Sequence, residues 1–370
     1  MRLIFLYVRD GAAPGNVYNP IIPTRNFYAN RIKDEGYFYI LKRMVEEKIV
    51  DEVLIFIESN KGPGYINYGN KITGHVMPDI ADLKQYIRPD DIIYVRGGFK
   101  SWYDHLVNYK EQGHWMLLYA ANTGREKWPL WSVVFNDLTG NNKFDASGRF
   151  QFDFKKPINP NLFFPIKTTR NYDVCIGASH IHDKKGQWRA VQALIEYKKI
   201  FNENLKCIMP GALRKGVETY KMLDILKNNI VNVTMPGMVS RSQLNKIYNR
   251  SKLFVHLGGG GQGDRGPLEA LRCGTPVMIG NKTRHSKTVY QNAKACTVIP
   301  INASAEDIAR ILYYNIATYN ERARKYITNY FEETNGIETV ILPEMKKLFN
   351  IFRTYPLYNK EALMAVYPSL

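Results

Sequence analysis

The segment Ser251–Gly280, SKLFVHLGGGGQGDRGPLEALRCGTPVMIG, decides how the second half of this chain folds. It begins with an apolar run at 253–257 that is short enough for a buried strand. A glycine-rich loop follows at 258–266. Pro267 then favours the start of a helix, because it has no N–H to leave unpaired. A second apolar strand comes at 276–279. Strand, glycine loop and helix together predict a phosphate-binding site, since glycines let an anion approach the backbone and the helix start offers free N–H groups.

Two other interpretations of this segment stay open. One is a tight strand-to-helix turn in which Glu269 stabilises the first turn of the helix, although such a turn rarely needs so many glycines. The other is a dinucleotide site, because Gly258, Gly260 and Gly263 fit the pattern GxGxxG. The acidic residue expected about 20 residues further on is absent, and a threonine and an arginine stand there instead.

The segment resembles the nucleotide-sugar loop of the retaining GT-B glycosyltransferases of group 1, the family-4-like enzymes. Their pattern is a Glu, seven residues, a second Glu followed by Ala, a short helix and Gly-x-Pro-Val. Here PLEAL at 267–271 and CGTPV at 273–277 match the second half. The resemblance implies that Glu269 binds the ribose hydroxyls of the donor nucleotide, and that backbone N–H groups face its diphosphate and sugar. Gly261 stands in place of the first Glu, which removes the usual contact to the donor sugar. The loop residues expected to bind substrate are Gly261, Gln262, Gly263, Asp264 and Gly266.

A basic turn, SHIHDKKG at 179–186, follows the first predicted strand of the same half. Its Lys-Gly pair resembles the family's lysine that contacts the donor diphosphate, and this implies the same role for Lys185. The family usually has an arginine just after the strand, where Ala178 and Ser179 stand here; we include Ser179 among the substrate-binding positions. We hypothesise that Arg265 supplies the missing charge. Both cations would stabilise the leaving diphosphate electrostatically. A solvated basic turn is the simpler alternative.

No metal or cofactor is expected. His180 and His182 are too few for a metal site without a third ligand, and GT-B enzymes generally need no metal. The resemblance implies a UDP- or GDP-linked sugar as co-substrate, and retention of the anomeric configuration. No residue of the sequence is identified as a protein nucleophile.

The chain of 370 residues is long enough for two domains. Strands alternate with helices throughout, which predicts an α/β fold with parallel sheets. The resemblance implies the GT-B fold, two Rossmann-like domains facing across a cleft. We expect an acceptor-binding domain at 1–165, a nucleotide-sugar-binding domain at 166–335, and a helix and tail at 336–370 that return to the first domain. The proline-broken segment 154–165 is typical of a linker.

Polar residues follow predicted strands of the first domain, at 92–95 and 115–120. Because ligands bind at the carboxyl ends of parallel strands, Arg96, Asn122 and Arg125 are candidates for an acceptor site. Ordinary solvated loop residues are the alternative for each of them. Residues 62–69 are turn-rich, and residues 353–370 show no clear period.

The net charge of +17 suggests anionic partners. Residues 1–165 carry 21 Lys and Arg against 18 Asp and Glu, a net +3, and residues 166–370 carry 30 against 16, a net +14. The excess therefore lies in the half with the glycine loop. The charge keeps open a transferase acting on modified DNA bases, or peripheral contact with an acidic membrane. A non-catalytic nucleotide-sugar-binding protein is a further alternative, because a glutamate and an arginine of the pattern are missing.

The four cysteines have no metal-binding spacing, which suits a reduced, cytoplasmic protein. No apolar stretch reaches the 18 residues that suggest a transmembrane helix, so no transmembrane segment is expected.

Overall fold

The computed structural model of this chain describes most of its length in two compact units. One unit joins Met1–Pro157 to Ile337–Leu370, and the other is Ile158–Gly336. The residues described are 1–9, 32–59, 64–96, 100–119, 127–136, 141–177, 180–181, 185–213, 216–228, 230–258, 265–281, 290, 294–318 and 321–368. Below, the unit that holds both ends of the chain is unit 1, and the other is unit 2.

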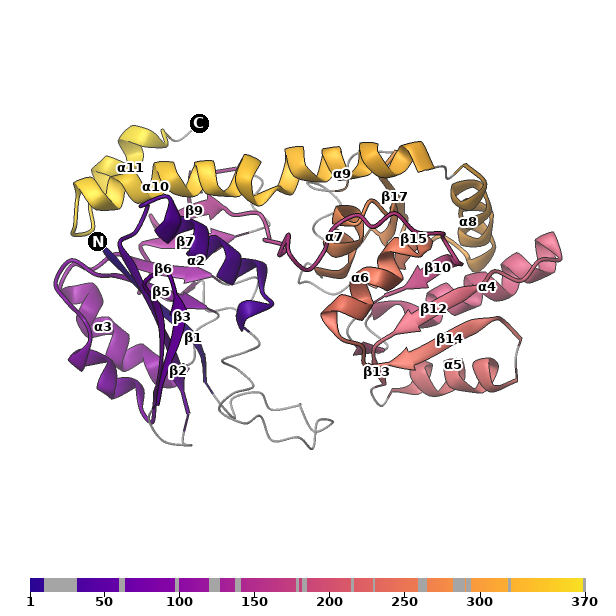
Figure 1. Ribbon diagram of the computed structural model, residues 1–370, viewed down its shortest axis with the longest axis horizontal. Coiled ribbons are helices and arrows are strands. Elements are labelled where there is room, and N and C mark those ends of the chain that lie inside the picture. The colour runs from indigo at the N-terminus through magenta and orange to yellow at the C-terminus, as the bar shows by residue number, and fades with distance from the viewer. Residues whose placement is uncertain are drawn as a thin grey trace. The chain divides into compact units, whose positions relative to one another are not determined.

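Unit 2 is built on a six-stranded sheet in the order β14-β12-β10-β15-β16-β17, in which all the neighbouring strands are parallel (Figure 1). A two-stranded parallel pair, β11 with β13, lies beside it. The strands are β10 (Tyr172–Ile176), β11 (His180–Ile181), β12 (Cys207–Pro210), β13 (Ala212–Leu213), β14 (Val233–Gly237), β15 (Ser251–His256), β16 (Val277–Gly280) and β17 (Cys296–Ile299).

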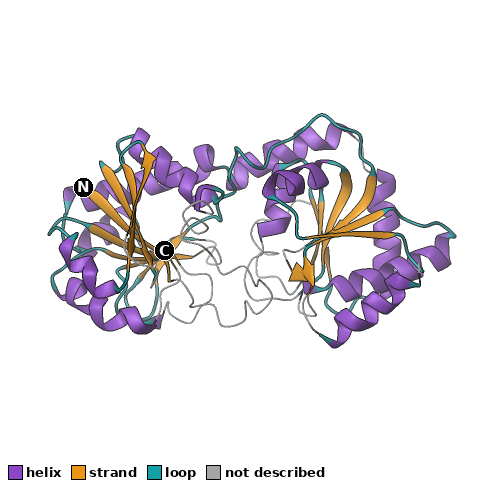
Figure 2. Ribbon diagram, turned by 60° about the horizontal axis from the view of Figure 1, so that its bottom comes forward, coloured by secondary structure: helices purple, strands orange, loops and turns teal. Residues whose placement is uncertain are grey.

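Helices cover both faces of this sheet (Figure 2). Val174 and Val255 face one apolar layer, which contains α4 and α8, whereas the alternate residues Cys175 and Phe254 face a second layer, which contains α6, α7 and α9. Burial on both faces explains why the strands are continuous apolar runs rather than alternating ones. The helices are α4 (Gln187–Phe201), α5 (Val217–Lys227), α6 (Arg241–Asn249), α7 (Arg265–Arg272), α8 (Ala305–Thr318) and α9 (Glu321–Asn335).

Unit 1 contains a nine-stranded sheet in the order β3-β4-β2-β1-β5-β6-β7-β9-β8. It is parallel except at its two edges, where β3 and β8 pair antiparallel to their neighbours. The strands are β1 (Arg2–Arg9), β2 (Glu52–Glu58), β3 (Gly64–Gly69), β4 (Ile72–Met77), β5 (Ile92–Arg96), β6 (Met116–Tyr119), β7 (Val133–Asn136), β8 (Lys143–Phe144) and β9 (Phe150–Asp153), and the helices α2 (Gly36–Glu46) and α3 (Tyr103–Glu111) belong to opposite apolar layers.

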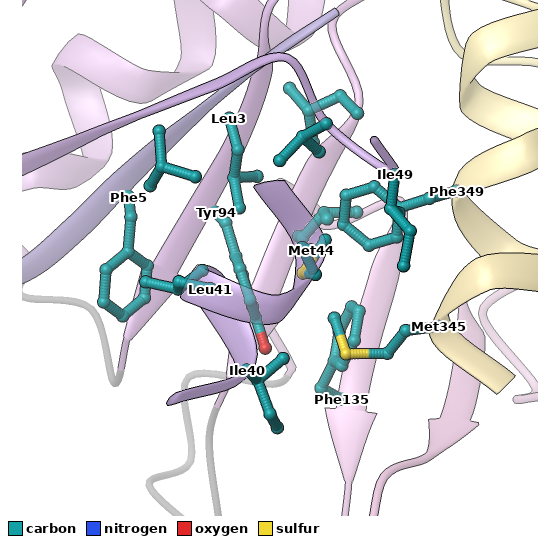
Figure 3. Packing of buried hydrophobic residues seen from close by; sticks show 14 of the residues in the cluster. Leu3, Phe5, Ile40, Leu41, Met44, Ile49, Tyr94, Phe135, Met345 and Phe349 are labelled. Carbon is teal, nitrogen blue, oxygen red and sulfur yellow. The ribbon is translucent and has the colours of Figure 1, made fainter. Parts of the chain in front are cut away.

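The end of the chain packs into unit 1. A π-helical turn, Ile337–Ile341, leads into α10 (Leu342–Thr354), which is followed by α11 (Lys360–Val366). Met345 and Phe349 of α10 are buried against the core layer that contains Met44 and Phe135 (Figure 3). The last helices are therefore part of the core of the first half of the chain.

Two details differ from the domain boundaries expected from the sequence. The units divide after Pro157 rather than after residue 165. The segment 154–165 is also packed rather than free, because Phe154 is buried in unit 1 whereas Ile158 and Phe163 are buried in unit 2. Its prolines exclude regular structure, but its apolar side chains anchor it at both ends.

Candidate functional site

The carboxyl ends of three neighbouring strands in unit 2 lie side by side. In the parallel register, Ile176 of β10 pairs with Val255 of β15, and His256 of β15 pairs with Ile279 of β16. The chain leaves β15 through Leu257 and Gly258 into the glycine-rich loop. In parallel α/β sheets this edge is where ligands bind.

Two glycines hold the backbone at the start of the loop. Gly186 has φ +76°, and a Cβ atom placed on it would collide with the backbone of Leu257 and Gly258. On the neighbouring strand, a Cβ on Gly280 would lie 2.9 Å from the Leu257 carbonyl oxygen. The turn that contains Lys185 is therefore in direct backbone contact with the first residues of the glycine loop. Only glycine permits such a close approach at positions 186 and 280.

A third close approach brings α7 to the same edge. The ring of Phe254 fills the space over Gly177, where a Cβ would collide with it, and a Cβ on Gly266 would lie 3.1 Å from the same ring. Gly266 is the second residue of α7, so the start of this helix lies close to the end of β10. A helix start with unpaired N–H groups next to glycine backbone is suited to an anionic ligand.

Lys185 and Arg265, the two expected cations, both border this edge. Lys185 is half-buried and precedes Gly186, which caps the N-terminus of α4. Arg265 is half-buried and is the first residue of α7. Within the described part of the chain, the structure shows no hydrogen bond or ion pair for Arg265. Its guanidinium therefore has no protein acceptor there that takes the place of a ligand.

Glu269 lies inside unit 2 and already has two partners. It is 3% exposed, Arg241 Nη1 donates to its Oε1 at 2.8 Å, and the Tyr248 hydroxyl donates to its Oε2 at 3.2 Å. Burial, together with the charge of Glu269, raises the pKa of Tyr248 well above its usual value, which keeps that hydroxyl a donor. Each carboxylate oxygen has a second lone pair, so a ribose hydroxyl can still donate to it.

The sequence did not reveal Arg241 and Tyr248. They lie 28 and 21 residues before Glu269, and no local pattern links such positions. His256 was also missed; it is buried at the end of β15, where its Nδ1 lies 3.0 Å from the Gly177 carbonyl oxygen, and so it ties β15 to β10. The only available signal was that His256 lies two residues before Gly258, where the glycine loop begins.

Unit 1 has a polar cluster at the carboxyl ends of its own strands. Arg96, the last residue of β5, donates from Nη2 to Glu35 Oε1 at 3.2 Å, and the Tyr7 hydroxyl donates to the same oxygen at 3.0 Å. The sequence predicted Arg96 as a site residue, but not Glu35. Glu35 precedes α2 and is buried, and nothing in the sequence around it indicates a long-range partner.

Several expected site residues lie outside the described residues: Ser179, Gly261, Gln262, Gly263, Asp264 and Asn122, together with Arg125 and His182. Within the described ranges, no group of three or more His, Cys, Asp or Glu side chains could hold a metal ion. All four cysteines are buried and unpaired. No helix in the described part of the chain is long and apolar enough to cross a membrane.

Part of this chain matches a known protein family. Residues 160–331 match the family model of the glycosyl transferases of group 1. No curated protein matches the sequence.

Solved structures match over nearly the whole chain. The sucrose-phosphate synthase of Thermosynechococcus elongatus gives a TM-score of 0.65 at 13% identity, covering 96% of this chain and 100% of that one. A glycosyltransferase of Rickettsia africae gives 0.62 at 16% identity, covering 98% of both chains. An E. coli trehalose-6-phosphate protein bound with UDP-2-fluoro glucose gives 0.60 at 9% identity, covering 95% and 98%.

These likenesses identify the fold as GT-B, with two parallel-sheet domains. The match of residues 160–331 to the group 1 family model indicates a transferase enzyme. The alternative of a non-catalytic binding protein is thereby disfavoured.

Proposed function

We propose that this chain transfers a sugar from a UDP- or GDP-linked donor to an acceptor, with unit 2 binding the donor and unit 1 the acceptor. The carrying observation is the contact of Gly186 with the backbone of Leu257 and Gly258, which joins the turn of Lys185 to the glycine loop. This contact brings together two motifs that are about 70 residues apart in the sequence, which supports our proposal that they form one anion site suited to a diphosphate.

In this proposal the protein contributes charge and position rather than a covalent step. Lys185 and Arg265 stabilise the negative charge that builds up on the diphosphate as the bond to the sugar breaks. Glu269, held by Arg241 and Tyr248, accepts hydrogen bonds from the ribose hydroxyls. Retention of configuration is proposed from the resemblance to the group 1 enzymes, and so is activity without a metal or cofactor.

Thermal-shift measurements with a panel of nucleotide sugars test the donor. A donor present at 100 times its Kd adds about 2.7 kcal/mol to the unfolding free energy, and so raises the Tm clearly. Lys185→Ala should abolish most of this shift, whereas Lys199→Ala should not, since Lys199 lies near the other end of α4 and is paired with Glu196. A panel that contains UDP- and GDP-sugars and shifts no Tm would contradict the proposal.

A chelator tests whether turnover needs a metal ion. We expect donor turnover to continue unchanged in excess EDTA, because the cations assigned to the diphosphate are side chains. Turnover that stops with chelator and returns with magnesium or manganese would assign the diphosphate to a bound metal instead.

The DNA-base alternative needs phosphate-binding charge on the acceptor side. Residues 1–165 have a net charge of only +3, which does not favour it.

A further inference from the structure

The polar cluster of unit 1 holds one guanidinium in a fixed position. Arg96 Nη2 lies 3.2 Å from the Glu35 carboxylate, and the guanidinium carbon lies 4.9 Å from the centre of the Tyr7 ring. The Tyr7 hydroxyl donates to the same carboxylate at 3.0 Å. Arg96 is thus fixed at one edge by an ion pair and at one face by an aromatic ring, so little side-chain entropy is lost when it binds a ligand.

Within the residues that the structure describes, most N–H donors of this guanidinium have no protein acceptor. An arginine has five N–H groups, and in the described part of the chain the only acceptor that Arg96 reaches is Glu35. The side chain of Arg96 is 28% exposed, whereas that of Glu35 is 6% exposed. A ligand at this edge of the sheet therefore meets Arg96, with Glu35 behind it.

The charge of the cluster selects the kind of ligand. The Glu35 carboxylate balances the Arg96 guanidinium, so the pair offers hydrogen-bond donors without a net positive charge. An oxyanion would be attracted by Arg96 but repelled by Glu35 at almost the same distance. A hydroxyl group accepts a hydrogen bond from the guanidinium without that repulsion.

Aromatic side chains complete the surroundings. Tyr119, half-buried at the end of β6, packs its ring 5.0 Å from that of Tyr37 and 5.6 Å from that of Phe154. The Tyr37 hydroxyl is buried and has no hydrogen-bond partner within the described residues. Burial raises the pKa of Tyr37 well above its usual value, so it remains a neutral phenol. Aromatic walls with a few fixed polar groups are typical of small-molecule sites.

We infer that Arg96, held in place by Glu35, is a binding residue for the hydroxyl groups of an uncharged sugar ring in unit 1. That this sugar is the acceptor rests on the function proposed above; its binding does not.

Saturation-transfer NMR on the full chain, with the methyl glycosides of glucose, galactose and mannose as probes, tests the inference. We expect at least one of them to bind, and Arg96→Lys to weaken its binding by about tenfold or more, because lysine keeps the charge but loses the fixed fork of donors. The matched control is Arg43→Lys, whose arginine pairs with Glu46 of α2, with Glu47 just after that helix and with Glu338 of the π-helical turn. Equal binding by the Arg96→Lys variant, or no binding of any probe to the wild type, would overturn the inference.

Competition with inorganic phosphate distinguishes a site for an uncharged ligand from a site for an anion. Phosphate should not displace the glycoside from the wild type, but it should compete in Glu35→Gln, where Arg96 is an uncompensated cation. Competition in the wild type would show an oxyanion site instead. If Glu35→Gln does not fold, the Arg96→Lys comparison and the wild-type competition still decide. Nucleotide-sugar titration of Arg96→Lys reports the proposed donor function separately, and its affinity should equal that of the wild type.

Discussion

The two sheets of this protein end in opposite kinds of chemistry. At the carboxyl edge of unit 2, Gly186 and Gly280 lie directly against the backbone of Leu257, and Gly266 lets the start of α7 approach the ring of Phe254. At the carboxyl edge of unit 1, the last residues of β5 and β6 have large side chains, Arg96 and Tyr119. An edge built from backbone offers N–H groups to an anion, whereas an edge built from side chains presents particular donors and rings. Under the proposed function, the two parallel sheets would divide donor and acceptor recognition through the size of the residues at these edges.

The largest expected effect concerns the cations at the backbone edge. Lys185→Ala and Arg265→Ala should each lower kcat/KM by roughly 10²–10³, the scale for losing one preorganised donor to a developing charge. Because both are proposed to face one diphosphate, the double variant should lose less than the product of the two. Steady-state kinetics of the wild type, the two single variants and the double variant complete this double-mutant cycle. A silent Arg265→Ala would mean that Arg265 is surface charge beside a glycine turn.

The glycine contacts themselves give the next effect. Gly186→Ala should lower the unfolding free energy of unit 2 by about 2–4 kcal/mol, since it adds left-handed strain and a collision with the Leu257 backbone. Gly237→Ala is the matched control: Gly237 also has positive φ, at +72°, but nothing lies within 4 Å of its Cβ position. It should cost only about 1 kcal/mol. Urea unfolding measures both, and equal losses would show that the close approach contributes nothing.

Glu269 tests this comparison further, because it is a side chain at the edge of unit 2 that is otherwise built from backbone groups. Glu269→Gln should weaken nucleotide binding by about 1.5–3 kcal/mol, the scale of a hydrogen bond to a charged group. It should also destabilise the fold, since the Arg241 guanidinium loses the negative charge of its ion-pair partner. Tyr248→Phe removes only the hydrogen bond from the Tyr248 hydroxyl to Glu269 and should leave nucleotide affinity unchanged. Calorimetric titration that finds the same affinity in Glu269→Gln would make this carboxylate an internal partner alone.

Much of the fold could be predicted because its signals are local. The apolar runs at 253–257 and 276–279 predicted the parallel strands β15 and β16, and the strands predicted at 92–95 and 115–120 correspond to β5 and β6. The helix of residues 360–366 was missed because it is a short helix in a segment without a clear period. The antiparallel strand β3 was also missed, since its sequence, GYINYG, begins and ends with glycine like a turn.

The site was predictable only where a motif carried it. The Lys-Gly turn and the PLEAL helix are local patterns, and the structure brings the turn to the start of the glycine loop that precedes the helix. The partners of Glu269 and Arg96 come from distant positions, because burying a charge requires a partner in space rather than in sequence. For that reason no local pattern in the sequence indicated that removing Glu269 would also disturb the fold.

The most direct test of the donor site compares a nucleoside diphosphate with the monophosphate of the same base by calorimetric titration. The wild type should bind the diphosphate more tightly, and the ratio of the two affinities should fall toward one when Lys185 and Arg265 are both replaced by Ala. Lys199→Ala should leave the ratio unchanged. A ratio that stays the same in the double variant would contradict the claim that this edge of unit 2 binds the donor diphosphate.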